Sequence, residues 1–390
     1  MKRNPGYRLQ RIANTEYLLP YGQQIVDHRR GISLNSTGVY VWSLLEKEIS
    51  REELTSEYLK HFSDVPEPKE ALVADLDQFL NHLVALRMIQ DDSPAQPRVG
   101  KAQASLQIAG LTLALHGPDE LVEASYLQAF RAGSANHADM DIFVHAGRPG
   151  STDNGAVLLR SPELWVLERK TDYLLHFPTF SQINELSVTK DGAVAAFYCK
   201  LPFSEELGTE FFHALRHVFL FLAQKHGMYA IHSASICYAD RAWLFSASSG
   251  TGKSTHNNVW NQLYGTEIIN GDLNLLSIED GRPVVHGIPW CGTSEMFDKR
   301  TLPLGGIVLL KRGEEDAVEE LPPDKQALLV MQRFISPIWT GTQLKASARF
   351  AQKLSGQVPV CRLHCTKNPS AAETMKAWID GNAHFSCKKC

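Results

Sequence analysis

The first 90 residues open with short apolar runs that are typical of strands. Candidates are residues 17–20, 24–27 and 32–35, which are separated by Gly22 and Gly31. Glycine readily adopts the left-handed conformation that tight turns require, so both positions favour chain reversal. The pattern therefore predicts a small sheet at the start of the chain.

Three helices are expected to follow this sheet. Apolar residues recur at helical spacing after Ser36, the expected N-cap of the first helix. A second helix is predicted over residues 51–61, where Ser50 precedes the helix as its N-cap. The third runs from 70 to 88 and repeats apolar residues every three or four positions. Residues 1–90 therefore form a small α+β unit.

Beyond residue 90 the sequence predicts a linker followed by a mostly β segment. Residues 91–104 contain two prolines and few apolar positions, which indicates a linker. From 105 to 227 strand-like runs alternate with turns, for example a strand over residues 106–113. This mostly β segment closes with an amphipathic helix over residues 210–225.

The segment 228–380 alternates strands with helices, the pattern of an α/β domain, and residues 381–390 form a tail. An apolar strand leads into a loop rich in glycine and serine, and a helix without glycine or proline leaves it. The expected fold class is thus a multidomain α+β and α/β protein. The strands are predicted at residues 242–245, 267–269, 304–310 and 358–363, and the helices at 254–263, 324–335 and 371–379.

The loop between strand and helix has the composition of a phosphate-binding P-loop. Its glycines let successive backbone N–H groups point into one concavity, beside the positive end of the following helix. A lysine there neutralises phosphate oxygens, and the next hydroxyl binds Mg²⁺. Ala247 stands where the usual pattern has its first glycine, and an ordinary surface loop is the alternative. The expected nucleotide-binding residues are Ser249, Gly250, Thr251, Gly252, Lys253, Ser254 and Thr255.

Two further residues are candidates for chemistry beside this loop. Asp272 follows the next strand, where a carboxylate faces the same crevice as the P-loop. The alternative is a turn aspartate after Asn270-Gly271, a strong turn dipeptide. His232 precedes the strand that enters the loop, although a lone histidine is more often structural. We therefore predict catalytic roles for His232, Asp272 and Lys253, and metal binding by Ser254 and Asp272.

The order of short motifs resembles a known family. His232-Ser233-Ala234-Ser235, the P-loop, residues 270–273, 287–292 and 302–304 follow one another as in HPr serine kinase/phosphorylase-related proteins. The resemblance spans about residues 105–380. It implies a P-loop fold shared with ATP-type phosphoenolpyruvate carboxykinases, and phosphorylation of a hydroxyl side chain with ATP and Mg²⁺.

The same resemblance assigns roles and shows one departure. His232 corresponds to the family's histidine ahead of the P-loop, and Asp272 to the second of two paired aspartates. That pair handles the metal and deprotonates the acceptor hydroxyl. Gly271 stands in place of the first aspartate, which leaves reduced or lost catalysis open. The signature segment of true HPr kinases has no clear counterpart, so HPr is not the expected substrate.

Residues 1–90 resemble PqqD-like domains, which are winged-helix-like. The likeness rests on the strands, the Leu-Asn…Trp…Leu-Leu series at 34–45 and the helix over 75–89. It implies binding of a precursor peptide of a ribosomally made, modified product, whose leader adds as a strand beside the sheet. The alternative is a small domain for dimerisation or nucleic-acid binding. Acidic residues of the helices speak against nucleic acid: Glu46, Glu48, Glu52, Glu53 and Glu57.

Together the two halves predict a tethered enzyme. It would be an ATP-dependent kinase that phosphorylates a Ser or Thr hydroxyl of a precursor peptide recruited through its leader by residues 1–90. A nucleotide-gated peptide carrier without catalysis is one alternative, and Gly271 is the feature in its favour. A regulatory serine kinase acting on a folded protein is another. A small-molecule kinase would leave residues 1–90 unexplained.

The composition of the chain bears on its partners and on its location in the cell. The net charge of -4 argues against general nucleic-acid binding, and no run of about 18 apolar residues predicts a membrane span. The start of the chain lacks the apolar core of a secretory signal. Seven cysteines, an odd number, fit free thiols in a reducing cytoplasm. A homo-oligomer is compatible with the sequence. Zinc is not expected, because Cys361 shares a strand face with core residues; the other members of a four-thiolate set would be Cys365, Cys387 and Cys390.

Overall fold

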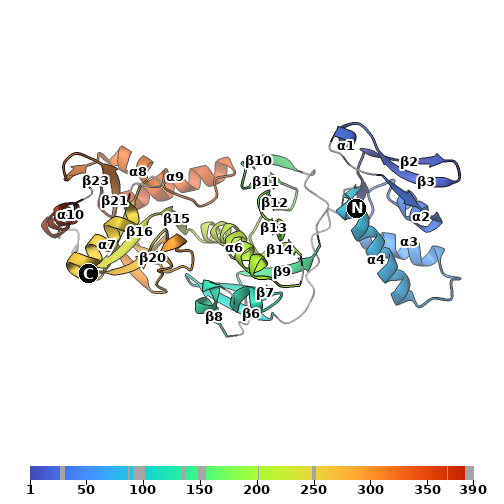
Figure 1. The fold of residues 1–390 in the computed structure, drawn as a ribbon, viewed down its shortest axis with the longest axis horizontal. Coiled ribbons are helices and arrows are strands. Elements are labelled where there is room, and N and C mark those ends of the chain that lie inside the picture. Colours follow the sequence, from blue (N-terminus) through green and yellow to red (C-terminus); the bar gives the residue numbers. More distant parts are fainter. Residues whose placement is uncertain are drawn as a thin grey trace. The chain divides into compact units, whose positions relative to one another are not determined.

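The chain divides into two compact units, which are described separately (Figure 1). One unit comprises residues 1–100, 143–190 and 196–202, and the other comprises 101–142, 191–195 and 203–390. The predicted segment 105–227 therefore contributes residues to both units, and the domain boundaries drawn from the sequence stay a prediction. The computed structural model describes residues 1–26, 31–86, 88–90, 102–123, 125–133, 137–147, 155–200, 202–247, 252–366 and 368–382.

The chain begins with a three-stranded antiparallel sheet. Its order is β2 (Tyr7–Ile12), β3 (Thr15–Pro20) and β4 (Ile32–Leu34), which confirms the expected strands at 17–20 and 32–35. The expected strand at 24–27 is wrong, because the short helix α1 (Gln23–Val26) occupies this place. Gly22 is left-handed with φ 61°, and its carbonyl accepts from the N–H of Ile25, which starts a helical turn. Asp27 lies outside the described residues.

The three helices of this region are α2 (Ser36–Leu44), α3 (Arg51–His61) and α4 (Lys69–Ala85). The N-cap of α2 is Asn35 rather than Ser36, because the Asn35 side chain accepts from the N–H of Gly38 at 2.8 Å. Ser50 caps α3 as predicted and forms a reciprocal capping box with Glu53. The third helix ends before the predicted position 88, and β5 (Ile89–Gln90) then pairs with β1 (Lys2–Arg3).

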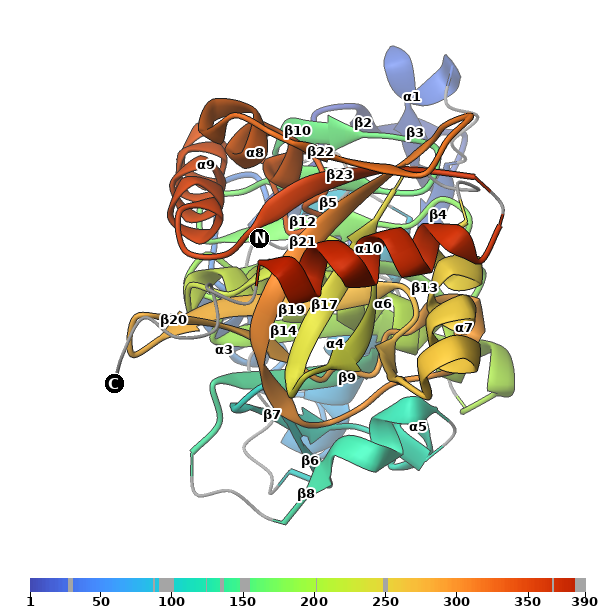
Figure 2. The same ribbon diagram turned by 90° about the vertical axis from the view of Figure 1, so that its left-hand side faces the viewer.

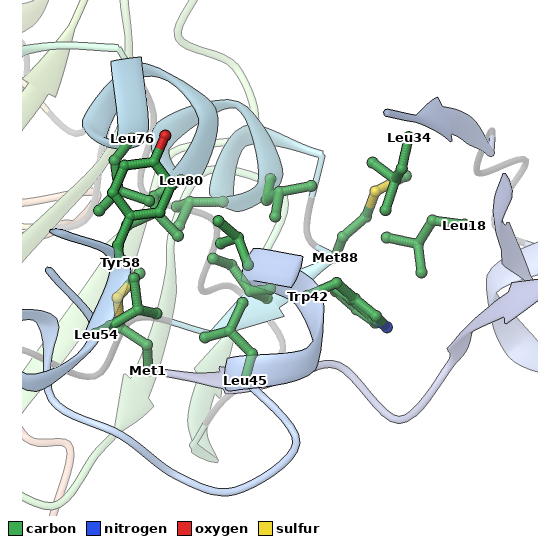
Figure 3. Close-up of a cluster of buried hydrophobic side chains, with 14 of the residues drawn as sticks. Met1, Leu18, Leu34, Trp42, Leu45, Leu54, Tyr58, Leu76, Leu80 and Met88 are labelled. Atoms are coloured by element: carbon green, nitrogen blue, oxygen red, sulfur yellow. The ribbon is translucent and has the colours of Figure 1, made fainter. Parts of the chain in front are cut away.

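The hydrophobic core of this N-terminal domain is built from its own residues. The buried cluster draws only on residues 1–89, and Trp42, Leu54 and Leu80 are among its fully enclosed members (Figure 3). Figure 3 shows these side chains pointing inward from α2, α3 and α4. A cluster closed within one short stretch of chain indicates a domain with its own core.

The segment after residue 101 is mostly β, as expected. The predicted strand 106–113 is wrong in detail, because Ala109 and Gly110 both have positive φ and reverse the chain into a hairpin. The remaining strands of the first unit form an antiparallel meander, and β9 and β14 have residues in both units. The elements are β6 (Ala104–Ile108), β7 (Leu111–His116), α5 (Glu120–Glu123), η1 (Tyr126–Phe130), β8 (Arg131–Ala132), β9 (Met140–Ala146), β10 (Ala156–Arg160), β11 (Trp165–Glu168), β12 (Asp172–His176), β13 (Ile183–Thr189) and β14 (Val194–Cys199).

The described part of the second unit contains a mixed nine-stranded sheet. Strand β21 lies parallel to β17 and β23 and antiparallel to β20. The order is β15-β19-β20-β21-β17-β16-β18, and β22 and β23 extend it beside β21. The strands are β15 (Tyr229–His232), β16 (Ala234–Tyr238), β17 (Arg241–Ser246), β18 (Glu267–Asn270), β19 (Leu273–Glu279), β20 (Arg282–His286), β21 (Thr301–Arg312), β22 (Ala317–Glu320) and β23 (Val360–Cys365).

Alternating side chains give this sheet two apolar faces. Leu244 packs toward α8 (Pro323–Met331) and α9 (Gly341–Ser355), whereas its neighbours Trp243 and Phe245 pack toward the opposite layer. That layer consists of α7 (Lys253–Tyr264) and α10 (Ser370–Gly381), and Figure 2 shows α10 lying across β17 and β21. The result is a three-layer α/β sandwich, in line with the mixed α/β class expected from the sequence.

Several helix boundaries differ from expectation. Helix α8 ends at Met331 rather than 335, and the sequence pattern did not predict α9. Helix α6 (Glu205–Lys225) begins five residues before the predicted 210, because Ser204 caps it through the N–H of Leu207. Every helix of the described residues is too short or too polar to cross a membrane.

Candidate active site

The predicted phosphate-binding loop lies between β17 and α7. Gly252 is the N-cap of α7 with φ 106°, a left-handed conformation that favours glycine. Lys253, Ser254 and Thr255 form the first turn of the helix, so their backbone N–H groups belong to its positive end. Three predicted nucleotide-binding residues lie outside the described ones: Ser249, Gly250 and Thr251.

Three predicted site residues meet next to this helix end. The Nε2 atom of His232 lies 3.0 Å from Nζ of Lys253 and 3.1 Å from Oδ1 of Asp272. His232 is the last residue of β15, and Asp272 lies in the turn between β18 and β19, two residues beyond the strand end. The fold therefore brings together side chains that are 40 positions apart in sequence.

The Nε2 atom of His232 lies within hydrogen-bond distance of a donor, Lys253, and of an acceptor, Asp272. The Lys253 ammonium can only donate a hydrogen bond, and the Asp272 carboxylate can only accept one. If Nε2 is unprotonated it accepts from Lys253, and if it carries a proton it donates to Asp272. The protonation of a single atom thus decides which neighbour His232 holds.

Backbone hydrogen bonds fix this group on the sheet. The Ser246 hydroxyl at the end of β17 donates to the carbonyl of His232 at 2.7 Å. The N–H of His232 donates to the carbonyl of Arg333 at 2.9 Å, and the N–H of Ser233 donates to the carbonyl of Asp272 at 3.0 Å. These bonds hold the backbone at His232 and Asp272 in place.

Asn270 organises the turn that carries Asp272. Its side-chain oxygen accepts from the N–H groups of Asp272 and Leu273 at 2.9 and 3.0 Å. Its amide nitrogen donates to the carbonyls of Ile288 and Trp290 at 3.2 and 3.3 Å. This buried residue ties the turn to the loop 287–292. In sequence it looked only like half of a turn dipeptide, so its role in the scaffold was missed.

The loop 287–292 packs against α6 through Trp290 and approaches Asp272 through Gly292. Trp290 is buried, and its Nε1 donates to the carbonyl of Phe212 in α6 at 2.9 Å. The Trp290 ring lies against the rings of Phe212 and Phe219, with centroids 5.8 and 5.0 Å apart. The loop thereby fixes α6 against the turn at Asp272.

The space beside Gly271 is already filled. A Cβ atom at position 271 would lie 1.9 Å from Oγ of Ser294, in the short helix η2 (Gly292–Ser294). At Gly292 a Cβ atom would lie 2.8 Å from Cβ of Asp272. A carboxylate in place of Gly271 would therefore require Ser294 to move. Gly271, Gly292 and Ser294 thus enclose Asp272 closely.

The charged side chains near Asp272 affect its pKa and are affected by it. A hydrogen bond from His232 is the main cause that lowers the pKa of Asp272, and the charges of Lys253 and Arg216 add to it against the effect of burial. Burial lowers the pKa of Lys253; Asp272 opposes this shift and Arg333 reinforces it. Lys253 and Arg216 thus place two positive charges near this carboxylate, and Arg333 adds a third near Lys253, an arrangement that suits a polyanionic ligand such as a nucleotide phosphate.

Arg216 was not expected from the sequence. It lies in α6 within a polar stripe formed with His213 and His217. Burial lowers the pKa of His217 to about 3 and also lowers the pKa of Arg216, which the charge of Asp272 opposes. Arg216 and His217 are half-buried and His213 is exposed, so the stripe lies at the boundary between the protein interior and solvent. Three cationic or titratable side chains within two turns of an apolar helix are the signal that would have drawn attention to it.

A metal at this site would have to rely on few protein ligands. Among the described residues, no three His, Cys, Asp or Glu side chains are grouped so as to hold a metal ion. This fits Mg²⁺, which binds nucleotide sites through one or two carboxylates and the phosphates themselves. Of the four terminal cysteines, Cys361 and Cys365 are buried against α10, and Cys387 and Cys390 lie outside the described residues.

Comparison with known proteins finds a likeness for most of the N-terminal domain. The family model for coenzyme PQQ synthesis protein D (PqqD) matches residues 23–89. The expected likeness to PqqD-like domains is confirmed for this part of the chain. No curated protein matches the sequence. The structure of the Hpr(Ser) kinase/phosphatase from Coxiella burnetii is similar to 41% of this chain over 99% of its own length, with 8% identity and a TM-score of 0.25. A likeness of that size does not establish a shared fold, so the chemistry rests on the residues themselves.

Proposed function

We propose that the chain is an ATP-dependent kinase that phosphorylates a Ser or Thr hydroxyl of a precursor peptide. The observation that carries this proposal is the meeting of Lys253, His232 and Asp272 at the N-terminal end of α7. A cation, a base and a carboxylate beside a helix N-terminus are the groups that phosphoryl transfer needs. The order of motifs from 232 to 304 resembles HPr kinase-related proteins and agrees with this chemistry.

The residues divide the work by charge. Lys253 and the N–H groups of the first turn of α7 would hold the terminal phosphates, and Arg216 would add positive charge nearby. Ser254 and Asp272 would hold Mg²⁺, which neutralises phosphate oxygens when it is bound. The lowered pKa of Asp272 keeps its carboxylate anionic, as metal binding demands.

The proposed transfer is an in-line displacement. The oxygen of the acceptor hydroxyl forms a bond to the γ-phosphorus, and the bond from that phosphorus to the bridging oxygen of ADP breaks. The hydroxyl proton passes to Asp272 or to His232. With a single aspartate at positions 271–272, His232 supplies the second basic group, because its Nε2 becomes available once Lys253 turns to the phosphates.

The N-terminal domain would recruit the peptide. Strand β4 lies at the edge of the three-stranded sheet, where an extended peptide can add its own backbone hydrogen bonds. Phe79 of α4 lies near Leu34 of β4, since both would contact a side chain added at Gly38. A leader held between β4 and α4 would present its attached core peptide at high effective concentration.

Intact-mass spectrometry tests this function. A short precursor peptide encoded beside the gene is incubated with the protein, ATP and Mg²⁺. The proposal predicts a gain of one phosphate that requires Lys253. Deletion of residues 1–90 should raise the KM for the peptide by about 100-fold and leave kcat nearly unchanged, because only the tethering is lost.

A nucleotide-gated peptide carrier is the second candidate. The crowding of Gly271 by Ser294 favours it, because that packing excludes the paired aspartate of HPr kinase-related proteins. The carrier would bind the peptide with an affinity that changes with ATP, and the peptide would gain no mass. Measuring both the binding of the peptide and its mass therefore separates the two candidates.

A further inference from the structure

The N-terminal domain contains a cavity of about 360 Å³ at one end of its sheet. Asn35, Thr37 and Gly38 line it and follow directly after β4, the edge strand. Helix α4 forms the opposite wall, and the end of α3 closes the third side. A peptide added along β4 would therefore reach this cavity where the strand ends. The volume lies within the range of ordinary ligand pockets.

The cavity combines apolar walls with an acidic rim. Val41, Leu72 and Phe79 supply its walls, whereas Glu67 and Asp75 are exposed carboxylates on its lining. Among the described residues that line it there is no lysine, arginine or histidine. The rim thus carries negative charge that no lining side chain neutralises.

Both carboxylates act on one residue of the cavity, Tyr58. The side chain of Tyr58 is buried in the domain core and also lines the cavity. Burial raises the pKa of the Tyr58 hydroxyl, and the charges of Asp75 and Glu67 raise it further. The negative charges of both acids thus extend to a hydroxyl that lines the cavity, so a cation bound there would be attracted by both.

We propose that this cavity binds a lysine or arginine side chain of the leader peptide. The long aliphatic stem would pack on Val41, Leu72 and Phe79, while the charged end reaches Glu67 and Asp75. Hydrogen bonds between a cation and a carboxylate are about twice as strong as neutral ones, which makes such a contact selective. This inference rests on the proposed peptide binding and adds the side-chain chemistry that the domain selects.

A displayed library of random 20-residue peptides tests the inference on the full chain. Wild type and the double variant Glu67→Gln/Asp75→Asn are used as baits in parallel. Wild type should enrich peptides with lysine or arginine at one position of an otherwise apolar motif. The double variant should lose that preference and keep the other enriched positions. A selected peptide, resynthesised, should bind the variant about 10- to 100-fold more weakly.

Two further variants sharpen the result. The charge reversal Glu67→Lys/Asp75→Lys should select an acidic residue at the same position. The control Glu57→Gln/Asp64→Asn removes two exposed acids outside the cavity lining and should behave as wild type. If wild type enriches no peptide, the proposed peptide binding itself is overturned. If it enriches peptides without a basic position, or the double variant keeps that position, only the inference about the cavity is overturned.

Discussion

The N-terminal domain and the α/β sandwich differ in how many polar side chains they bury. Among the described residues of segment 1–90, Asn4 is the one polar residue that is fully buried. The sandwich buries many, including Asn270, Asn274 and His256. Buried polar groups are costly unless each is hydrogen-bonded, and when satisfied they hold a structure rigid. A catalytic group has to be held rigidly. The edge strand of a peptide-binding sheet does not need the same rigidity.

The polar network of the sandwich stands directly behind the candidate site. The Ser235 hydroxyl donates to Oδ1 of Asn274 at 2.6 Å, and Nδ2 of Asn274 donates to the carbonyl of Ser233 at 2.6 Å. Asn270 adds four hydrogen bonds at the turn that carries Asp272. The N-terminal domain instead keeps its charges at the surface, around an edge strand and an acidic cavity. In the function that we propose, the first arrangement positions the catalytic groups and the second recognises the peptide.

The largest expected effect comes from removing the lysine at the end of α7. Lys253→Ala should lower phosphate transfer by about 10³-fold, because the charge that neutralises the phosphates is lost in a partly buried site. Peptide binding should be unchanged. Rate measurements at saturating ATP and peptide check the first statement, and fluorescence anisotropy of a labelled leader checks the second.

A matched control is Lys345→Ala, which removes an exposed lysine of α9. It should keep full activity. Full activity of Lys253→Ala would contradict the proposed mechanism. Loss of peptide binding in the same variant would contradict the separation between the two regions.

The next effect is on stability and depends on pH. The pKa of His256 falls from 6.5 to about 4, chiefly through burial, and its Nε2 accepts from Nε1 of Trp260 at 3.0 Å. A protonated imidazole cannot accept that bond. The unfolded chain binds the proton more readily, so this histidine destabilises the sandwich as pH falls from 6.5 toward 4. The loss amounts to roughly 3 kcal/mol.

Urea unfolding at pH 7 and at pH 4.5 measures this loss. His256→Gln keeps a hydrogen-bond acceptor but has no titrating group, so its stability should fall by roughly 3 kcal/mol less than that of wild type. Equal pH dependence in the two proteins would show that His256 is not buried in its neutral form. No residue of the described N-terminal domain should show a similar effect, since no histidine there is buried.

Local signals were sufficient to predict much of the fold. Ser50 and Glu53 are three positions apart, and the capping box they form starts α3 at the predicted residue. The strand–loop–helix order around Lys253 was also visible, because a P-loop is a continuous stretch of chain. One failure of the pattern has a short-range backbone cause. The left-handed residues Ala109 and Gly110 turned one expected strand into a hairpin.

The surroundings of the site could not be predicted in the same way. Ser294 fills the space at Gly271, and Asn270 bonds to the carbonyls of Ile288 and Trp290. The charge of Arg216 acts on Asp272 from a helix more than 50 positions earlier in the chain. Such long-range effects depend on how the strands are ordered in the sheet. That order cannot be predicted from local patterns in a single sequence.

The packing at Gly271 gives a third prediction. Gly271→Ala should destabilise the sandwich by about 2 kcal/mol and reduce activity, because the new methyl group collides with Oγ of Ser294. The double variant Gly271→Ala/Ser294→Gly removes the collision and should recover most of the lost stability. Thermal unfolding of the two variants measures the coupling between the positions. Additive effects would show that Ser294 is not what excludes a side chain at 271.

The smallest effect tests the N-terminal domain through its best local signal. Ser50→Ala removes the side chain that accepts from the N–H of Glu53 at 3.1 Å, and it should cost about 1 kcal/mol. Ser56→Ala, in the middle of α3, is the control and should change stability by less than about 0.5 kcal/mol. Urea unfolding of the three proteins measures both differences. Phosphate transfer at saturating peptide should stay unchanged, because a weakened cap in the binding domain leaves the network around Asp272 intact. A fall in kcat would mean that the binding domain also supports the chemistry, and the contrast between the two regions would no longer hold.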